Sequence, residues 1–365
     1  MPATALDLLY SSTASLIPAP RVLAGLPLIA VLPEGSSPLS GGVAEVVSAA
    51  GALALEVADR ITAQGLVDLQ AIFAQSPAPG SVWVTTYASA DSPEDALDQL
   101  VANAAARAAG VHRGALIYVG TRTDADLVTA SDWIGADGSR SLRFVSFAQC
   151  DTAGLLTSGK PAALADAEIA ESAIVYHATD AEPGAAALAG RIAGVSLLDG
   201  PVAAQIRVSG VAVSGPTLDE GTFLLANDGI GIYQTGDGSS AADRMAVGTR
   251  SYGGVGLTGL ISVAYLLRRV DDAVLAVIRS AAIRGRPIKA DASGEGVVAA
   301  AISEVLAELA AAGHWTPYEL DDGTALPDGW RVVVTSSDGV IRPAIDVAVA
   351  REARAYSLTT LAYEV

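Results

Sequence analysis

The sequence predicts a mixed α/β (α+β) protein with two domains and an extended arm at each terminus. Three observations lead to this prediction. First, a chain of 365 residues is longer than one small hydrophobic core usually organises. Second, short apolar strands alternate with Ala-rich helices over residues 25–205, the pattern of a layered α/β domain. Third, residues 206–349 follow a different pattern, with glycine-bearing strands, two long helices and a closing pair of strands.

The elements of the N-terminal domain follow from local composition. Runs of β-branched and aromatic residues predict strands at 26–32, 82–87, 115–119, 142–147 and 174–177. Helical patterns occupy 66–73, 92–109, 124–133 and 183–192, whereas 52–57 fits either a strand or the start of a helix. Ser92 is a typical N-cap, because Pro93 stands at the first helical position and two acids follow in the first turn. Gly110 is expected to end that helix.

The C-terminal domain is expected to be built around two long helices. Strands are predicted at 202–213 and 223–233, helices at 260–283 and 294–312, and further strands at 331–335 and 344–349. The second helix carries apolar residues three and four positions apart, namely Val298, Ile302, Val305, Leu306 and Leu309. Gly313 is expected to end it.

Both terminal segments are rich in apolar residues, but neither is expected to fold on its own. Residues 1–24 are expected to form an extended arm, and residues 350–365 a second arm with strand propensity up to its end. An apolar segment that cannot fold alone often completes a neighbour's sheet. The residues expected to make such inter-subunit contacts are Leu6, Leu8, Leu9, Leu16, Ile17, Leu358, Leu361, Tyr363 and Val365.

Composition narrows the class of protein. Hydrophobic residues make up 51% and charged residues 17% of the chain, against about 25% charged in ordinary soluble domains, and the mean hydropathy is +0.42. No apolar run reaches the roughly 20 residues of a membrane span, and Asp7 interrupts any signal-peptide core. A net charge of −18 argues against nucleic acid or an anionic membrane as partner. We therefore expect a soluble subunit with extensive interfaces.

Residues that could support catalysis are few. His112, His177 and His314 lie far apart in the sequence and lack metal-ligand spacing, so we expect structural roles and no metal. Cys150 is the one cysteine; it cannot form an intrachain disulfide and is expected to be a small buried hydrophobe. We therefore expect a protein that is not an enzyme.

A glycine motif precedes the first long helix. Gly254, Gly256 and Gly259 match the spacing of a dinucleotide-binding loop. That fingerprint needs an apolar strand before it and an acid about 20 residues later on the next strand, and neither is present here. The glycines are expected to let the chain turn into the helix, and no cofactor is expected.

Basic residues concentrate after this motif. They are Arg268, Arg269, Arg279, Arg284, Arg286 and Lys289. Only Asp271 and Asp272 oppose them in the same stretch. Two interpretations fit: a solvated helix face, or a docking surface for an acidic partner.

Several segments, in order, resemble contractile phage tail sheath proteins, a pattern shared with tailocin and contractile injection system sheaths. They are AIFAQSPAPGSVWVTTY (71–87), FLLANDGIGIY (223–233) and MAVGTRSYGGVGLTGLISVAYLLRRVDDAVLAVI (245–278). The helix at 294–312 and the closing strand pair complete the similarity.

The resemblance implies an outer domain at 25–205, an inner conserved sheath domain at 206–349, and arms that exchange strands with neighbouring subunits. It implies six-fold rings stacked as a helical sheath around a tail tube protein, with baseplate and tail terminator proteins at the ends. The sheath would contract to drive the tube through the host envelope. The six bases would lie nearest the tube, and neither nucleic acid nor membrane would be a partner.

The resemblance also implies a place in the virion tail, after assembly in the bacterial host cytoplasm. Three alternatives stay open. The chain could be another tail or baseplate protein, a surface-layer or shell protein, or a nucleotide-dependent α/β enzyme using the 254–259 loop.

Overall fold

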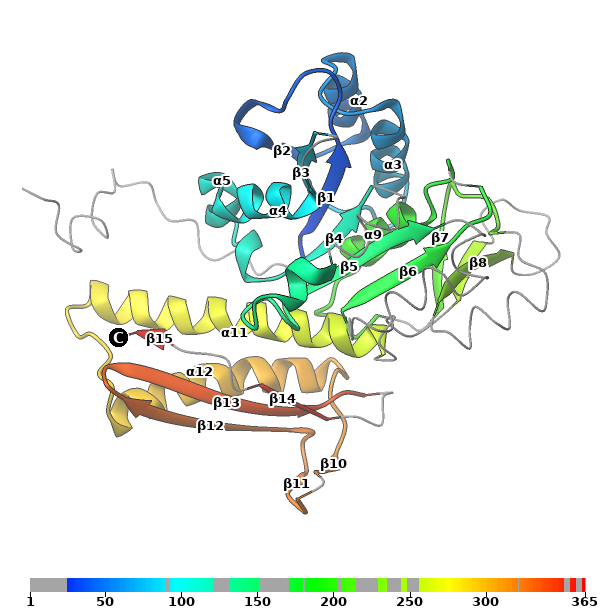
Figure 1. The fold of residues 1–365 in the computed structure, drawn as a ribbon. Coiled ribbons are helices and arrows are strands. Elements are labelled where there is room, and N and C mark those ends of the chain that lie inside the picture. The colour runs from blue at the N-terminus through cyan, green and yellow to red at the C-terminus, as the bar shows by residue number, and fades with distance from the viewer. Residues whose placement is uncertain are drawn as a thin grey trace, which may run out of the picture.

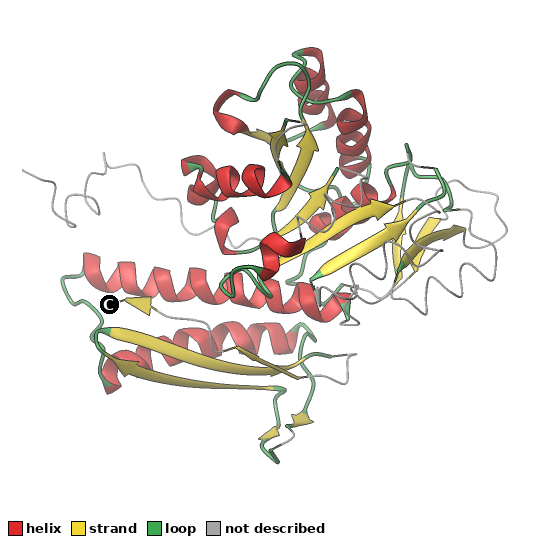
Figure 2. Cartoon of the chain, viewed as in Figure 1, coloured by secondary structure: helices red, strands yellow, loops and turns green. Residues whose placement is uncertain are grey.

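The protein is arranged in two layered regions joined by a long helix (Figure 1). The computed structural model describes residues 25–88, 92–120, 131–150, 171–179, 181–202, 205–214, 229–234, 244–247, 256–320, 322–350, 355–358 and 363–364. A large sheet with helices on both faces forms one region. Two helices and a smaller sheet form the other (Figure 2). The predicted mixed α/β class is confirmed.

The large sheet has nine strands in the order β2-β3-β1-β4-β5-β6-β8-β9-β7. Their bounds are β1 Leu28–Pro33, β2 Val43–Val46, β3 Val82–Tyr87, β4 Ala115–Val119, β5 Phe144–Cys150, β6 Ser172–Tyr176, β7 Gln205–Val208, β8 Ile230–Gln234 and β9 Arg244–Val247. The central strands from β3 to β8 pair in parallel, and the strands at both ends are antiparallel. Continuous apolar runs such as Leu28–Pro33 belong in such a centre, because parallel sheets are covered on both faces.

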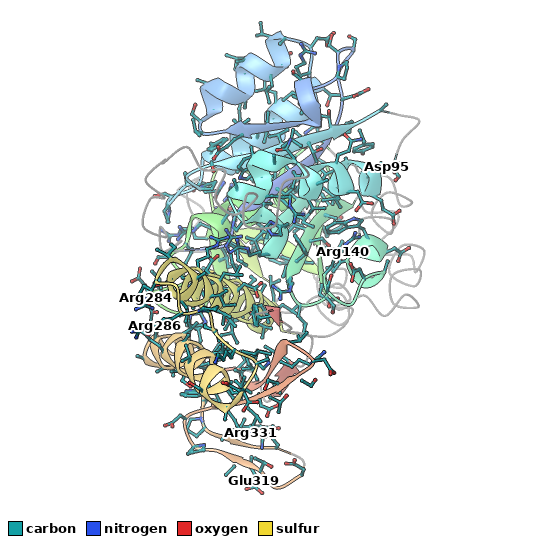
Figure 3. The ribbon with its side chains drawn as sticks, turned by 90° about the vertical axis from the view of Figure 1, so that its left-hand side faces the viewer. Asp95, Arg140, Arg284, Arg286, Glu319 and Arg331 are labelled. Atoms are coloured by element: carbon teal, nitrogen blue, oxygen red, sulfur yellow. The ribbon has the colours of Figure 1, made fainter. Side chains whose placement is uncertain are left out.

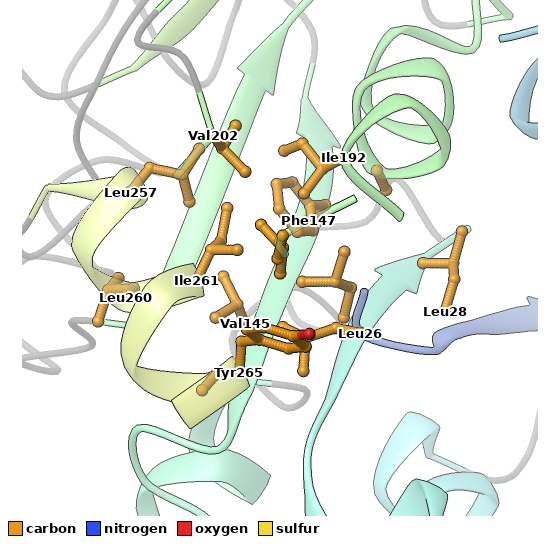
Figure 4. Close-up of a cluster of buried hydrophobic side chains, with 14 of the residues drawn as sticks. Leu26, Leu28, Val145, Phe147, Ile192, Val202, Leu257, Leu260, Ile261 and Tyr265 are labelled. Carbon is orange, nitrogen blue, oxygen red and sulfur yellow. The ribbon is translucent and has the colours of Figure 1, made fainter. Parts of the chain in front are cut away.

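Helices cover both faces of this sheet. Their bounds are α2 Ala49–Val57, α3 Ala63–Phe73, α4 Pro93–Ala102, α5 Ala104–Ala108 and α9 Gly184–Gly194, with short 3₁₀ turns η1 Ser40–Gly42 and η2 Val111–Arg113. Residues of α3 and α9 share one core with Leu28 and Phe147, whereas residues of α4 share the other with Ile29 and Trp133. Figure 4 shows the first core, where Phe147 and Ile192 lie in one cluster with Leu257 and Ile261 of helix α11 (Leu257–Ile283).

Local signals predicted several of these elements correctly. The capping box of α4 is present, with Ser92 and Asp95 reciprocally bonded and Pro93 at the helix start. The ambiguous 52–57 segment belongs to helix α2. The predicted helix over 92–109 is wrong in one respect, because Asn103 breaks it: its backbone is extended, and its side chain accepts from the amides of Ala105 and Ala106 to start α5.

The motif at 71–87 joins distant parts of the sheet. The buried side chain of Gln75 donates to the carbonyl of Ser209 at 2.9 Å and accepts from the amide of Ser209 at 2.9 Å. A Cβ added at Gly190 would lie 2.7 Å from the backbone of Ile72, so only glycine permits α3 and α9 to approach this closely. Residues 71–75 therefore position α3 against α9 and the segment after β7.

The two long helices are α11 Leu257–Ile283 and α12 Ala292–Ala311. Nearly every residue of the first three turns of α11 is buried. Asp291 caps α12 by accepting from the amides of Ser293 and Gly294. The apolar positions predicted for this helix, Val298, Ile302, Val305, Leu306 and Leu309, are all buried, which confirms the predicted periodicity.

A second sheet covers the far side of these helices. It consists of β12 Trp330–Ser337, β13 Val340–Ala348, β14 Ala355–Leu358 and β15 Tyr363–Glu364. The short pair β10 Tyr318–Glu319 and β11 Ala325–Leu326 forms a separate two-stranded sheet. Asp338 and Gly339 form the two-residue turn between β12 and β13, both with positive φ (54° and 77°), as a tight hairpin requires.

Strands β7, β8 and β9 lie between residues 205 and 247 and yet belong to the large sheet, so the sheet continues across the predicted boundary between 25–205 and 206–349. That boundary stays a prediction about the assembled protein. Strand β7 covers 205–208 of the predicted 202–213, where residues 203–204 are not described, and β8 covers 230–234 against the predicted 223–233, where residues 223–228 are not described. Of the predicted helix 124–133, residues 131–133 are helical, and 124–130 are not among the described residues.

Candidate assembly site

The C-terminal sheet, defined as β12, β13, β14 and β15, is built partly from the last residues of the chain. Strand β13 pairs along one edge with β12 and along the other with β14 and β15. Ile345 lies opposite Leu358, and Ile341 lies opposite Tyr363. Both partners from the predicted C-terminal arm are buried, Leu358 being 3% and Tyr363 7% exposed. Leu361 and Val365 lie outside the described residues, as do Leu6, Leu8, Leu9, Leu16 and Ile17.

The opposite edge of this sheet is strand β12. It is the terminal strand of the sheet within the described part of the chain. Its residues alternate between half-buried and exposed, and Val333 is 49% exposed. A long edge strand with apolar residues is a template for pairing with another chain. The C-terminal sheet therefore offers one edge that the chain's own C-terminal strands occupy and one edge that can accept a further strand.

A three-residue junction, Arg143–Asp271–Tyr363, ties the last strand to the rest of the molecule. The Tyr363 hydroxyl donates to Asp271 Oδ1 at 2.7 Å, and Arg143 Nη1 donates to Asp271 Oδ2 at 2.5 Å. Burial and then the Asp271 carboxylate raise the pKa of the Tyr363 phenol, so it stays protonated and can donate. The next residue of α11, Asp272, pairs with Arg113 of η2. Asp271 thus links the large sheet, helix α11 and the C-terminal strand.

Two of the six predicted tube-facing bases are used inside the chain. Arg268 is 2% exposed, and its guanidinium donates to the carbonyls of Ala109, Gly110 and Gly114 at 2.9, 2.6 and 3.0 Å. Burial lowers the pKa of Arg268 to about 10, which keeps it charged at neutral pH. Arg269 donates to Glu308 on α12 at 2.6 Å. These two side chains fasten α11 to its neighbours and are not available to a partner.

The other four bases form an exposed group, which we call the basic tip: Arg279, Arg284, Arg286 and Lys289. They lie on the last turns of α11 and in the connection to α12. Figure 3 shows Arg284 and Arg286 close together where α11 ends. Ile283 beside them is 71% exposed. None of the four forms an ion pair with another described residue, so the basic tip is a free cationic surface on a chain of net charge −18.

The histidines lie in separate surroundings. His314 is fully buried and bonds to Ser262 Oγ at 2.9 Å and the Leu197 carbonyl at 2.7 Å. His177 is buried, and its two ring nitrogens contact the carbonyls of Thr179 and Ala212. His112 lies in η2, where burial, followed by Arg107 and Arg113, lowers its pKa to about 4. Among the described residues, no group of three potential ligands could hold a metal ion.

The glycine motif and Cys150 belong to different parts of the fold, the motif to the start of α11 and Cys150 to the central strand β5. Gly256 is the N-cap of α11, and Gly259 is buried in its first turn, whereas Gly254 is not among the described residues. The motif follows β9, an antiparallel strand near the sheet edge, whereas a dinucleotide loop follows a central parallel strand. This placement disfavours the nucleotide-binding interpretation. Cys150 ends β5, and its side chain lies outside the described part.

The sequence analysis did not single out Arg113 or Arg143, and it did not predict that Asp271 links distant elements. In each of these contacts the two bonded residues are 92 to 159 positions apart along the chain. The one local signal is the presence of two adjacent acids, Asp271 and Asp272, in a largely apolar stretch of the helix. No helix in the described ranges is long and apolar enough to cross a membrane.

Known proteins match the fold and not the sequence. No protein-family model and no curated protein matches the chain. A sheath tail protein of Listeria innocua matches over 92% of this chain and 94% of its own, with a TM-score of 0.63 and 10% identity. The helical sheath of the anti-feeding prophage in its contracted state matches over 93% of both chains, with a TM-score of 0.59 and 16% identity.

A chain from the six-fold symmetrised baseplate structure of that prophage matches over 94% of both chains, with a TM-score of 0.58 and 14% identity. At such identities the likeness establishes the fold. The chain has the fold of contractile tail sheath proteins across nearly its whole length, as the motifs at 71–87, 223–233 and 245–278 predicted.

Proposed function

We propose that this protein is the structural subunit of a contractile tail sheath and is not an enzyme. The observation that carries the proposal is the match of nearly the entire chain, 92–94%, to sheath and baseplate chains that serve as structural components. The C-terminal sheet supports it, because its edge strand β12 is long enough to pair with a strand from a neighbouring subunit. The apolar composition supports it as well, since 51% hydrophobic residues suit a protein with large interfaces.

In the proposed assembly, subunits form six-fold rings that stack into a helical sheath around a tail tube. Strand β12 would accept the apolar N-terminal arm of a neighbour, and the C-terminal arm would be exchanged between copies. Contraction would replace one set of subunit contacts with a larger one while the exchanged arms hold the lattice together. The sheath would be part of a virion tail that assembles in the bacterial host cytoplasm, and it would meet baseplate and tail terminator proteins at its ends.

The basic tip is the proposed contact with the tube. Its four cationic side chains and the exposed Ile283 suit an acidic protein surface with apolar patches. Arg268 and Arg269 are left out of this proposal because their contacts are internal. The predicted tube-facing set thus narrows from six bases to four.

Electron microscopy of the purified full-length protein tests the proposal. We expect long striated tubes, or tubes that form once tail tube protein is added. Deletion of residues 1–15 or 352–365 should leave a folded chain, by circular dichroism, that forms none. Tubes of normal appearance from either truncation would overturn the role of that arm, and absence of any ordered polymer from the intact chain with its tube would overturn the function.

A baseplate component is the second candidate, because one of the matching chains comes from a baseplate structure. The same micrographs separate the two functions. A sheath subunit should extend a tube over many ring layers, whereas a baseplate subunit should stop at single closed rings even when tube protein is in excess.

A further inference from the structure

In this structure the C-terminal strands belong to the same chain as the sheet that they complete. Strand β14 pairs with β13 over 345–348, and β15 pairs with it at Val340 and Ile341. Leu358 packs in the main core at 3% exposure, and Tyr363 reaches Asp271 on α11. A single subunit can therefore satisfy this edge of β13 without a partner.

An edge of a strand can hold one partner at a time. Its outward amides and carbonyls are consumed by the strand that pairs with it. A C-terminal strand from another copy can bind to β13 only after the resident strand has left. Strand exchange between subunits therefore requires each subunit to open first.

We infer that the free subunit is held in a closed form by its own C-terminal strands, with Tyr363–Asp271 as the latch, and that a second copy's C-terminal strands bind the same edge of β13 during assembly. This inference rests on the proposed strand exchange. In the exchanged state the incoming strand takes the register seen here, and its Tyr363 donates to Asp271 of the accepting chain.

The geometry of the Arg143–Asp271–Tyr363 junction explains why the edge of β13 can still accept a strand after the chain's own C-terminal strands have left. Asp271 keeps its ion pair with Arg143 when Tyr363 leaves, so its buried charge is not left without a partner. Arg143 is held in turn by the carbonyl of Arg113 at 3.1 Å. The acceptor of the latch therefore stays in place on the body of the subunit.

Because exchange breaks and remakes the same contacts, the latch controls the rate of assembly more than its end point. The substitution Tyr363→Phe removes the hydrogen bond from both the closed and the exchanged forms. We expect opening, and with it the nucleation of tubes, to become about tenfold faster, the factor associated with loss of one hydrogen bond to a charged group. The critical concentration should stay within about twofold of wild type.

Light scattering during polymerisation and electron microscopy measure both quantities, and Tyr318→Phe on β10 is the matched control. Unchanged nucleation in Tyr363→Phe, or the same acceleration in Tyr318→Phe, would overturn the latch. A large change in critical concentration would also overturn it, because the bond would then differ between the two forms.

A disulfide pair tests the closed form directly. Ala348 and Ala355 lie opposite each other in the register, and such positions have Cβ atoms about 4.5–5.5 Å apart. In a Cys150→Ser background, the variant A348C/A355C should form an intramolecular disulfide while monomeric, visible as intact mass and as unchanged size on a non-reducing gel. The oxidised protein should not polymerise, and reduction should restore assembly.

Mixing the single variants A348C and A355C supplies the complementary result. Disulfide-linked dimers should appear only after tubes form. If the oxidised double variant polymerises as fast as the reduced one, the inference is wrong. If the intact chain never forms tubes and yet the monomeric disulfide forms quantitatively, the proposed function fails while the closed monomer stands, so the two failures are distinguishable.

Discussion

The two sheets of this protein differ in the length and exposure of their edge strands. In the large sheet, β1 is buried along its length apart from Pro33, and the edge strands β2 and β7 have only four residues each. In the C-terminal sheet, the edge strand β12 has eight residues that alternate between half-buried and exposed. Short edges discourage pairing between molecules, whereas a long apolar edge invites it. Within the described residues, the large sheet therefore has short edge strands, whereas the C-terminal sheet has a long edge strand that could pair with a further strand.

The largest effect should come from the core that joins the body to α11. Phe147 is fully buried beside Ile192 and Ile261, so Phe147→Ala removes a large side chain from a packed site. We expect a loss of about 3–5 kcal/mol in the free energy of unfolding, measured by chemical denaturation. The control is Val333→Ala on β12, which should cost less than about 1 kcal/mol. Equal losses would remove the distinction between the two sheets.

A smaller but still substantial effect should separate two arginines of the same helix. Arg268→Met leaves the carbonyls of Ala109, Gly110 and Gly114 without their buried donor, and we expect it to cost about 3 kcal/mol of stability. Arg279→Met removes an exposed charge and should change stability by less than about 0.5 kcal/mol. If both variants unfold at the same denaturant concentration, Arg268 does not fasten α11 to the body.

These two arginines also show what the sequence can predict. The capping box at Ser92 and the spacing from Val298 to Leu309 are local signals, and the structure confirms both. Arg268 and Arg279 share residue type and helix, yet Arg268 is buried because carbonyls 154 to 159 positions away along the chain surround it. No local pattern records such a contact.

The same reasoning explains the other differences between expectation and structure. Asn103 divides the predicted helix because its side chain accepts hydrogen bonds from the first amides of α5. Such a side-chain hydrogen bond offers the backbone an alternative to continuing the helix. Sheet membership of β7, β8 and β9 depends on pairing that is not encoded in their own residues. Tyr363 was predicted to meet a neighbour through its strand propensity, but the hydrogen bond to Asp271 required the folded α11.

The basic tip should affect partner binding without affecting the body. Reversal of charge at Arg284, Arg286 and Lys289 should weaken tube-templated assembly about tenfold or more, because favourable pairing becomes repulsion. Assembly without the tube, followed by light scattering, should change much less. The difference should shrink as salt increases, since exposed charges are screened. Equal weakening of both kinds of assembly would indicate a contact between sheath subunits and not with the tube.

The smallest expected effect concerns His112, which lies in η2 where the body meets α11. Its pKa is lowered to about 4, first by burial and then by Arg107 and Arg113, against a usual value of about 6.5. Between these values the unfolded chain binds a proton that the folded chain does not, so stability should fall as the pH decreases from about 6.5 towards 4.

The side chain is partly solvated, which reduces the effect to about 1 kcal/mol between pH 7 and pH 5. His112→Gln cannot titrate and should show a shallower dependence of unfolding free energy on pH over this range. Burial also lowers the pKa of His314, so a residual slope should remain in that variant. If the unfolding free energy of His112→Gln follows the wild-type pH profile, the imidazole is solvated in the native protein. Water would then reach the contact between η2 and α11, which the contacts of Arg113 and Arg268 are expected to keep closed.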